Sequence, residues 1–362
     1  WWTLEVYDLA SVDSVFAKRK QKLRSYNTAH LTVPFEIVIV RSGSETFLSV
    51  DMHHALYDGN SFDMLMNNVS KLYNSEEADF GKSFVDCLPF GPLRNVQGAK
   101  KFWLDHLSDV DPTAMKSVTD RKTDRDVLCT ASLGVLQQVD ELRRSLGVTI
   151  QALVQACWIA TLRKYHHGAV GTVVSGRSID FDGIENVIGP LFNTIPFYLR
   201  CESGDSWKTL VQRCHEFNTA ALPYQHTPLR DIMKWCNKGR SEPLFDTLFV
   251  FQGALDSSTT NTSILIPQAD DHFEADYPLS FEAEETGDGQ LNVTLAAKGS
   301  ICDDEKAREL IEEFHQAVRA MVGAPEDDVG VSIGHTFEQP TRTVNGDSAN
   351  TRKSGTASFD WT

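Results

Sequence analysis

The chain has 362 residues, 41% apolar and 23% charged, as is typical of globular proteins, and this length predicts two lobes rather than one. Its formal net charge of −16 argues against a nucleic-acid partner, because phosphates would repel it. With no run of 18 apolar residues and an opening WWTLEVYDL without methionine, the sequence predicts neither a membrane span nor a signal peptide, and suggests a piece of a longer protein.

The expected elements alternate between strands and helices along the chain. Segments 30–40 and 46–52 are rich in β-branched and aromatic residues and are joined by turn residues, which predicts a hairpin. Later segments with the same strand character cover 126–133, 169–176, 193–201, 244–252, 278–285 and 291–297.

Helices are expected where apolar residues recur at helical spacing. These segments cover 60–73, 99–107, 134–146, 149–165, 206–221 and 303–322. The segment 149–165 is apolar nearly all round, which predicts a buried helix. Ser206 is the expected cap of the helix that follows it. Proline and glycine mark 84–93 as an ordered loop.

The order of these elements predicts a two-lobe α/β protein. We expect a first lobe over 1–108 and a second over 109–324. From 325 to 362 the composition shifts to Gly, Ser, Thr, Asn and Pro, which predicts a flexible linker.

The cysteines and histidines argue against a structural metal. Seven cysteines are scattered without a C-x-x-C pair, a pattern typical of reduced thiols in a cytoplasmic protein. His166 and His167 are adjacent, so on a helix they point apart and indicate a surface helix end. No metal is therefore expected.

One short stretch, VDMHHALYDGNSFDML at 50–65, contains two histidines, an aspartate and a glycine where a predicted strand ends and a helix begins. Histidine exchanges protons near neutral pH, and two adjacent histidines leaving a strand, His53 and His54, face opposite ways. Asp58 is expected to close the turn by accepting backbone or arginine hydrogen bonds. Gly59 is expected to adopt a backbone conformation closed to other residues, with its amide at the start of the helix. The alternative is a capped turn whose histidines lie in a core.

Four motifs in register, and one further stretch that also fits (VVSGR), resemble the condensation domains of nonribosomal peptide synthetases. The residues of these motifs are most similar to those of fungal synthetases of ferrichrome-type siderophores. The matching stretches are HHALYDG (53–59), VVSGR (173–177), VIGPLFNTIPFYLR (187–200), LPYQHTPLRDI (222–232) and SEPLFDTLFVFQ (241–252).

The resemblance implies a two-lobe pseudo-dimer like chloramphenicol acetyltransferase, with a tunnel between the lobes. A donor acyl thioester and an acceptor amine, each on the phosphopantetheine arm of a carrier domain, would meet there and form an amide. His54 is implied to accept the amine's proton or to hold the amine, and Gly59 to let the backbone approach the thioester. We hypothesise that the Gly59 amide donates a hydrogen bond to the oxyanion. His53 and Asp58 belong to the structural part of the motif, with Arg177 as a candidate partner of Asp58.

The later motifs are implied to shape the tunnel and the lobe interface. Their expected tunnel residues are Asn193, Thr194, Gln225 and Gln252. No cofactor is expected to bind directly, because carrier domains supply the phosphopantetheine. Upstream and downstream carrier domains and a neighbouring adenylation domain are the implied partners.

Two early motifs of the family, Ser-x-x-Gln and Arg-His-x-x-Leu-Arg, are not found in this sequence. We therefore expect an incomplete N-terminal lobe. A terminal cyclising or ester-forming relative, a non-catalytic carrier-binding domain and a coenzyme A acyltransferase remain as alternatives. The first often has Ser in place of the first histidine, and the last has only H-x-x-x-D.

Overall fold

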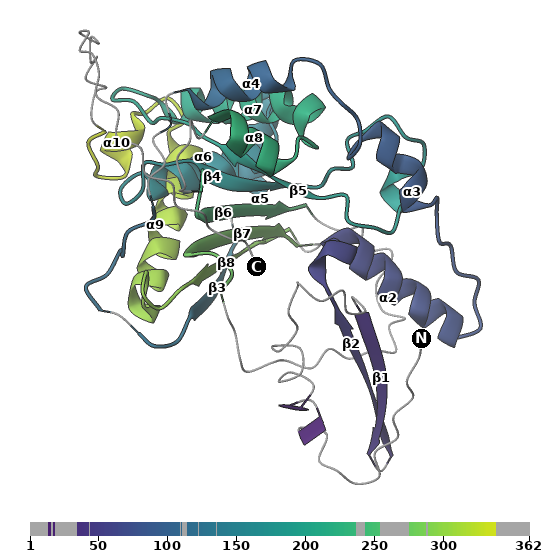
Figure 1. Ribbon diagram of the computed structural model, residues 1–362. Helices are drawn as coiled ribbons and strands as arrows, with labels where there is room; N and C mark the ends of the chain where they lie inside the picture. The colour runs from purple at the N-terminus through teal and green to yellow at the C-terminus, as the bar shows by residue number, and fades with distance from the viewer. Residues whose placement is uncertain are drawn as a thin grey trace, which may run out of the picture. The chain divides into compact units, whose positions relative to one another are not determined.

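In the computed structural model (Figure 1), the chain is described over 14–15, 17–18, 35–42, 44–108, 110, 114–121, 123–134, 136–236, 243–253, 275–286 and 289–337. These residues fall into two compact units, divided between Phe62 and Asp63. This division differs from the predicted lobe boundary at 108, which stays a prediction. Helix α4 (Ala99–Leu107) belongs to the larger unit because its Trp103 is fully buried in that unit's core.

The smaller unit contains the predicted hairpin. Strands β1 (Phe35–Ser42) and β2 (Glu45–Met52) pair antiparallel, with Phe35 opposite Met52. Val38 and Val40 point to one side and are buried. The expected first strand residues, 30–34, lie outside the described residues.

The larger unit is built on a six-stranded mixed sheet in the order β3-β8-β7-β6-β4-β5. Strand β6 pairs parallel with both β4 and β7, and the remaining pairs are antiparallel. All six predicted strands are present, each shorter than or equal to its sequence segment. Their bounds are β3 Val127–Leu133, β4 Val170–Val174, β5 Asn193–Phe197, β6 Thr247–Gln252, β7 Leu279–Glu285 and β8 Leu291–Ala297.

Every predicted helix is also present. The helices are α2 Gly59–Tyr73, α4, α5 Leu136–Leu146, α6 Ile150–Leu162, α7 Trp207–Ala221 and α9 Asp304–Gly323, and the structure adds α3 Phe84–Cys87, α8 Leu229–Cys236 and α10 Val329–Ser332. Short 3-10 turns cover η1 His54–Leu56, η2 Leu88–Phe90, η3 Ile184–Asn186 and η4 Leu222–Tyr224. Ser206 caps α7 as predicted, because its side chain accepts a hydrogen bond from the Thr209 amide.

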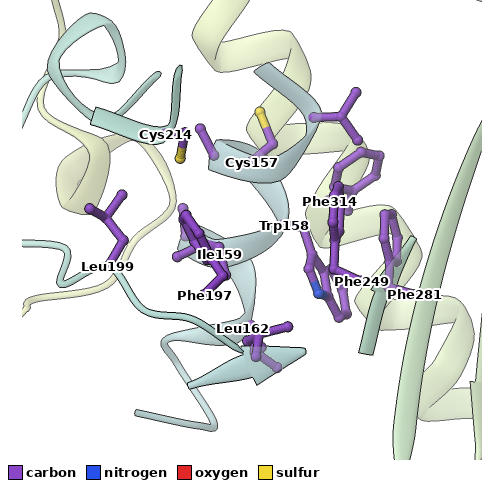
Figure 2. Close-up of a cluster of buried hydrophobic side chains, with 14 of the residues drawn as sticks. Cys157, Trp158, Ile159, Leu162, Phe197, Leu199, Cys214, Phe249, Phe281 and Phe314 are labelled. Atoms are coloured by element: carbon purple, nitrogen blue, oxygen red, sulfur yellow. The ribbon is translucent and has the colours of Figure 1, made fainter. Parts of the chain in front are cut away.

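Helix α6 lies at the centre of the core, as its apolar sequence predicts. Every residue from Ala152 to Leu162 is buried. Figure 2 shows Trp158 of α6 against aromatic side chains of the sheet and α9. Its ring stacks on Phe281 with centroids 4.1 Å apart, and Phe281 meets Phe314 at 4.8 Å. This contact joins the sheet to the helices that cover it.

Three local predictions are wrong. The loop expected at 84–93 contains α3 and η2, because the Ser83 side chain accepts a hydrogen bond from the Val85 amide and starts a helical turn. The expected linker does not start at 325, because the Lys208 amide donates to the Pro325 carbonyl and Phe337 is buried. Residues 338–362 lie outside the described residues. His166 is not at the surface but only 2% exposed.

Within the described ranges, no single helix has the length and apolar composition needed to cross a membrane. Helices α5 and α6 together reach that length, but they meet at a bend of 103°, and α6 is the core helix described above. All seven cysteines are free thiols.

Candidate functional site

The histidine motif occupies the connection between β2 and α2. Strand β2 ends at Met52, and His53 caps the 3-10 turn η1 with an extended backbone (φ −65°, ψ 132°). Asp58 then precedes α2, whose first residue is Gly59. The sequence prediction of a strand-to-helix junction is confirmed, with the turn η1 inserted between the two elements.

The two histidine rings have different hydrogen-bonded nitrogens. Nδ1 of His53 accepts a hydrogen bond from the Ala55 amide at 3.1 Å, so the neutral ring carries its proton on Nε2. Nδ1 of His54 lies 3.2 Å from the Tyr57 carbonyl oxygen, which only accepts, so the neutral ring carries its proton on Nδ1. The acceptor nitrogen of His54 is therefore Nε2, and that of His53 is Nδ1, which caps the turn.

The His54 ring is also held by stacking. It lies on the ring of Tyr57 with centroids 4.8 Å apart and an angle of 18° between the planes. The His54 side chain is nevertheless exposed, as is that of His53. Neither histidine is therefore buried in the core of its own unit. An exposed imidazole with a fixed orientation and a defined tautomer is suited to exchange a proton or to accept a hydrogen bond.

Asp58 is the N-cap of α2. Its side chain is buried, at 5% exposure, and its Oδ1 accepts hydrogen bonds from the Ser61 amide (2.7 Å) and the Ser61 hydroxyl (2.6 Å). Its carbonyl oxygen accepts from the Phe62 amide. The expectation that Asp58 closes the turn by accepting a backbone hydrogen bond is confirmed. Its pairing with Arg177 stays a prediction.

Gly59 does not have the backbone conformation that we expected. Its φ is not positive, because the residue is the first one of α2 and takes the ordinary helical conformation. A side chain at this position would meet no atom within 4 Å. Gly59 therefore leaves open space beside the first turn of the helix. Close approach of another group to the backbone is the other use of glycine, besides an unusual dihedral angle.

Arg177 lies in the larger unit, just after β4. Its Nη1 donates hydrogen bonds to the carbonyl groups of Ile184 and Val187, each at 2.9 Å. The guanidinium thereby closes the loop 177–187. Several such hydrogen bonds from one side chain are expected of arginine, whose planar group can serve several carbonyl groups at once.

The predicted tunnel residues lie in β5, in the turn after η4 and at the end of β6. Asn193, the first residue of β5, donates through Nδ2 to the carbonyl groups of Gln225 (2.8 Å) and Thr227 (3.0 Å), so the structure brings two of the motifs together. Thr194 pairs with β4 and is half-buried. Gln252 is exposed at the end of β6 and its amide donates to Glu282. That these residues shape a tunnel stays a prediction.

Sequence reasoning missed several residues of these arrangements. Ser61 is fully buried against Asp58, and the available signal for this cap was the aspartate just before the helical pattern. The stacking role of Tyr57 and the contact of His226 with the Gly176 carbonyl (2.8 Å) had no local signal. In the part of the chain that the structure describes, no three His, Cys, Asp or Glu side chains converge as a metal site requires.

Comparison with known proteins identifies the family. The model of the condensation domain family matches residues 14–332. Nonribosomal peptide synthetase 2 of Cochliobolus heterostrophus is 39% identical over 83% of this chain and 6% of its own length. Nonribosomal peptide synthetase sidC of Arthroderma benhamiae is 34% identical over 90% of this chain and 6% of its own length. The ferrichrome siderophore peptide synthetase of Mycosarcoma maydis is 28% identical over 78% of this chain and 7% of its own length. The chain thus spans less than a tenth of these relatives.

Solved structures share the fold. A four-domain nonribosomal peptide synthetase, holo-AB3403, matches with a TM-score of 0.71 and 15% identity, over 91% of this chain and 28% of that one. The X-domain from teicoplanin biosynthesis matches with a TM-score of 0.69 and 17% identity, over 91% and 80%. The epimerization domain of tyrocidine synthetase B matches at 0.61 and 14%, over 90% and 81%. The mixed α/β fold predicted from the motifs is confirmed, and the chain belongs to the condensation domain family of nonribosomal peptide synthetases.

Proposed function

We propose that the chain catalyses amide bond formation between a donor acyl thioester and an acceptor amine, both held on phosphopantetheine arms. The observation that carries the proposal is the state of His54. Its ring is exposed, stacked on Tyr57 and bonded through Nδ1, so Nε2 is the acceptor nitrogen. Attack of the amine forms the C–N bond, breaks the C–S bond and transfers one proton from nitrogen to the leaving sulfur.

His54 serves this reaction through Nε2. That nitrogen accepts a hydrogen bond from the attacking amine and orients its lone pair toward the thioester carbon, and the same atom can take the proton in passing. A thioester is already activated, so holding two tethered reactants in contact supplies a large part of the rate, on the order of 7–11 kcal/mol for well-oriented reactants.

Gly59 contributes space and a hydrogen-bond donor. The open space beside it admits the thioester to the first turn of α2. Its amide, at the positive end of that helix, donates to the oxygen that becomes negative when the amine attacks. Asp58 acts on the shape of the motif rather than on the substrates, because its Oδ1 is engaged by Ser61. The pairing of Asp58 with Arg177, and the tunnel roles of the later motifs, belong to this proposal.

The substrates come from other parts of a larger synthetase. The relatives named above are nonribosomal peptide synthetases, one of them a ferrichrome siderophore peptide synthetase, and this chain matches less than a tenth of each. We therefore assign it an upstream and a downstream carrier domain, which supply the phosphopantetheine, and a neighbouring adenylation domain. Siderophore assembly in the cytoplasm is the proposed context.

Two other functions remain in competition. The solved structures with this fold include an X-domain and an epimerization domain, so the fold alone does not select amide formation. A cyclising or ester-forming enzyme would release a ring or an ester, and a carrier-binding domain would leave both arms unchanged. His53, present here in the first position of the motif, favours amide formation over cyclisation.

The test loads both neighbouring carriers in the full module and follows the mass of each intact carrier with time. Amide formation adds the donor acyl mass to the acceptor carrier and leaves a free thiol on the donor. The change His54→Ala should slow this transfer by at least about 100-fold, the range for one lost acid–base group. The matched change His167→Ala, at an exposed residue outside the motif, should leave it unchanged. Absence of transfer in the unmodified module would overturn the proposal.

A further inference from the structure

The segment that carries Arg177 is fixed on both sides by two consecutive side chains from a distant turn. His226 donates from Nε2 to the carbonyl group of Gly176 at 2.8 Å, and Gln225 donates from Nε2 to the carbonyl group of Ser178 at 3.3 Å. These two carbonyl groups flank Arg177 in the sequence. The turn at 222–228 therefore holds the peptide group just before Arg177 and the second peptide group after it.

The geometry around His226 leaves little room for another arrangement. Gly176 has a left-handed backbone (φ +69°), and a Cβ there would come within 1.7 Å of the Leu191 oxygen and 2.8 Å of His226 Cε1. A Cβ at Gly91 would come within 2.9 Å of His226 Nε2. The imidazole thus fits between two glycines, one from the turn after η2 and one from the end of β4. Only residues without a side chain permit this approach.

The turn is itself anchored. Gln225 is 3% exposed, and the two hydrogen bonds from Asn193 reach the carbonyl groups on either side of His226. Burial lowers the pKa of His226, so the ring is neutral at neutral pH, with its proton on the nitrogen that donates to Gly176. Asn193, Gln225 and His226 consequently form one chain of contacts from the start of β5 to the Arg177 segment.

The geometry points to a role for these residues that differs from direct substrate contact: Gln225 and His226 are positioning residues for Arg177, with Asn193 as their anchor. The inference rests on the proposed function, in which Arg177 supports the histidine motif. The side-chain N–H groups of these residues donate to backbone carbonyl groups, so they act by fixing the backbone around Arg177 while the carbonyl groups of Ile184 and Val187 fix its guanidinium.

The test compares His226→Gln with His226→Met in the full module with loaded carriers. Glutamine places an amide N–H near the position of imidazole Nε2, whereas methionine fills a similar volume without a donor. We expect transfer to stay within about threefold of the unmodified rate with glutamine and to fall about tenfold with methionine, the range for loss of one buried hydrogen bond. The pair His167→Gln and His167→Met is the matched control. Equal loss in His226→Gln and His226→Met would overturn the role of the donor.

A double change separates positioning from general damage. If His226 acts through Arg177, adding His226→Met to Arg177→Ala should slow transfer by less than about twofold more. Multiplied effects, or an Arg177→Ala variant that transfers at the normal rate, would overturn the inference. Amide hydrogen exchange gives a readout that needs no activity. His226→Met should speed exchange over 177–187 about tenfold and leave α6 unchanged, whereas uniform acceleration or none would contradict positioning. If the unmodified module transfers nothing, the proposed function fails, and the exchange result still decides the structural part.

Discussion

Stability should fall in mild acid because of one buried imidazole, His106 of α4. The ring stacks on Phe217 with centroids 4.3 Å apart, and its Nε2 accepts a hydrogen bond from the Tyr198 amide at 3.3 Å. An accepting Nε2 must be unprotonated, so the folded protein requires the neutral ring. Burial accordingly lowers the pKa of His106 from 6.5 to about 4.

The sign and size follow from the two pKa values. Unfolded His106 takes up a proton below its ordinary pKa of 6.5, whereas the folded residue resists protonation down to about 4. The unfolded state therefore binds more protons between these values, and the free energy of unfolding decreases as the pH falls through this window. The full difference is about 3 kcal/mol, of which about 2 kcal/mol is lost by pH 5.

Urea denaturation followed by tryptophan fluorescence at pH 7 and pH 5 measures this loss. His106→Gln is the informative variant, because its side-chain oxygen can still accept from the Tyr198 amide but does not titrate. Burial also lowers the pKa of His166, His226 and His315, so the unmodified protein loses more stability in total. The difference between the two proteins isolates His106. Equal losses in both proteins would refute the reasoning.

Three further changes test local parts of the structure. Asp58→Ala removes the cap of α2 and should lower the free energy of unfolding by about 1–2 kcal/mol in urea denaturation, whereas Asp58→Asn should cost less; equal losses would argue against capping. Gly176→Ala forces a Cβ toward the Leu191 oxygen at a positive φ and should cost at least about 2 kcal/mol, seen as a lower thermal midpoint; an unchanged midpoint would contradict the packing. Arg163→Met removes four hydrogen bonds from a buried guanidinium to carbonyl groups. It should lower the free energy of unfolding by about 3 kcal/mol in the same urea assay. A decrease below about 1 kcal/mol would show that the carbonyl groups find other partners.

Local chemistry in the sequence was sufficient for most elements. The Ser206 cap predicts the start of α7, and the continuous apolar run predicts that α6 is buried, because both signals act within a few residues. The short helix α3 was missed although Ser83 is followed by Asp86 in its first turn. Proline and glycine nearby favoured a loop, and four residues are too few for helical periodicity to show.

Part of the candidate site could also be predicted from the sequence, and part could not. The position of His54 at a strand-to-helix junction follows from the motif and its flanking periodicity. The tautomer does not, because it depends on the Tyr57 carbonyl group and hence on the course of the backbone through η1. Gly59 shows the limit of residue type alone: glycine predicts an unusual dihedral angle, whereas in the structure it only leaves the position without a side chain.

Contacts between distant segments were beyond sequence reasoning. Asn193 and Gln225 were recognised as motif residues, but their 32-residue separation carries no spacing signal for the hydrogen bond between them. The same holds for His226 and Gly176, which are 50 residues apart. Such contacts form because the order of strands in the sheet brings the end of β4 and the start of β5 together.

The most direct measurement of the central claim is the single-turnover rate of acyl transfer between loaded carriers for three changes at His54. Glutamine places an acceptor near the position of Nε2, asparagine places one near Nδ1, and alanine places none. Because the accepting atom is Nε2, His54→Gln should transfer at least about tenfold faster than His54→Asn, which should match His54→Ala. Transfer that is undiminished in His54→Ala, or faster in His54→Asn than in His54→Gln, would contradict the account.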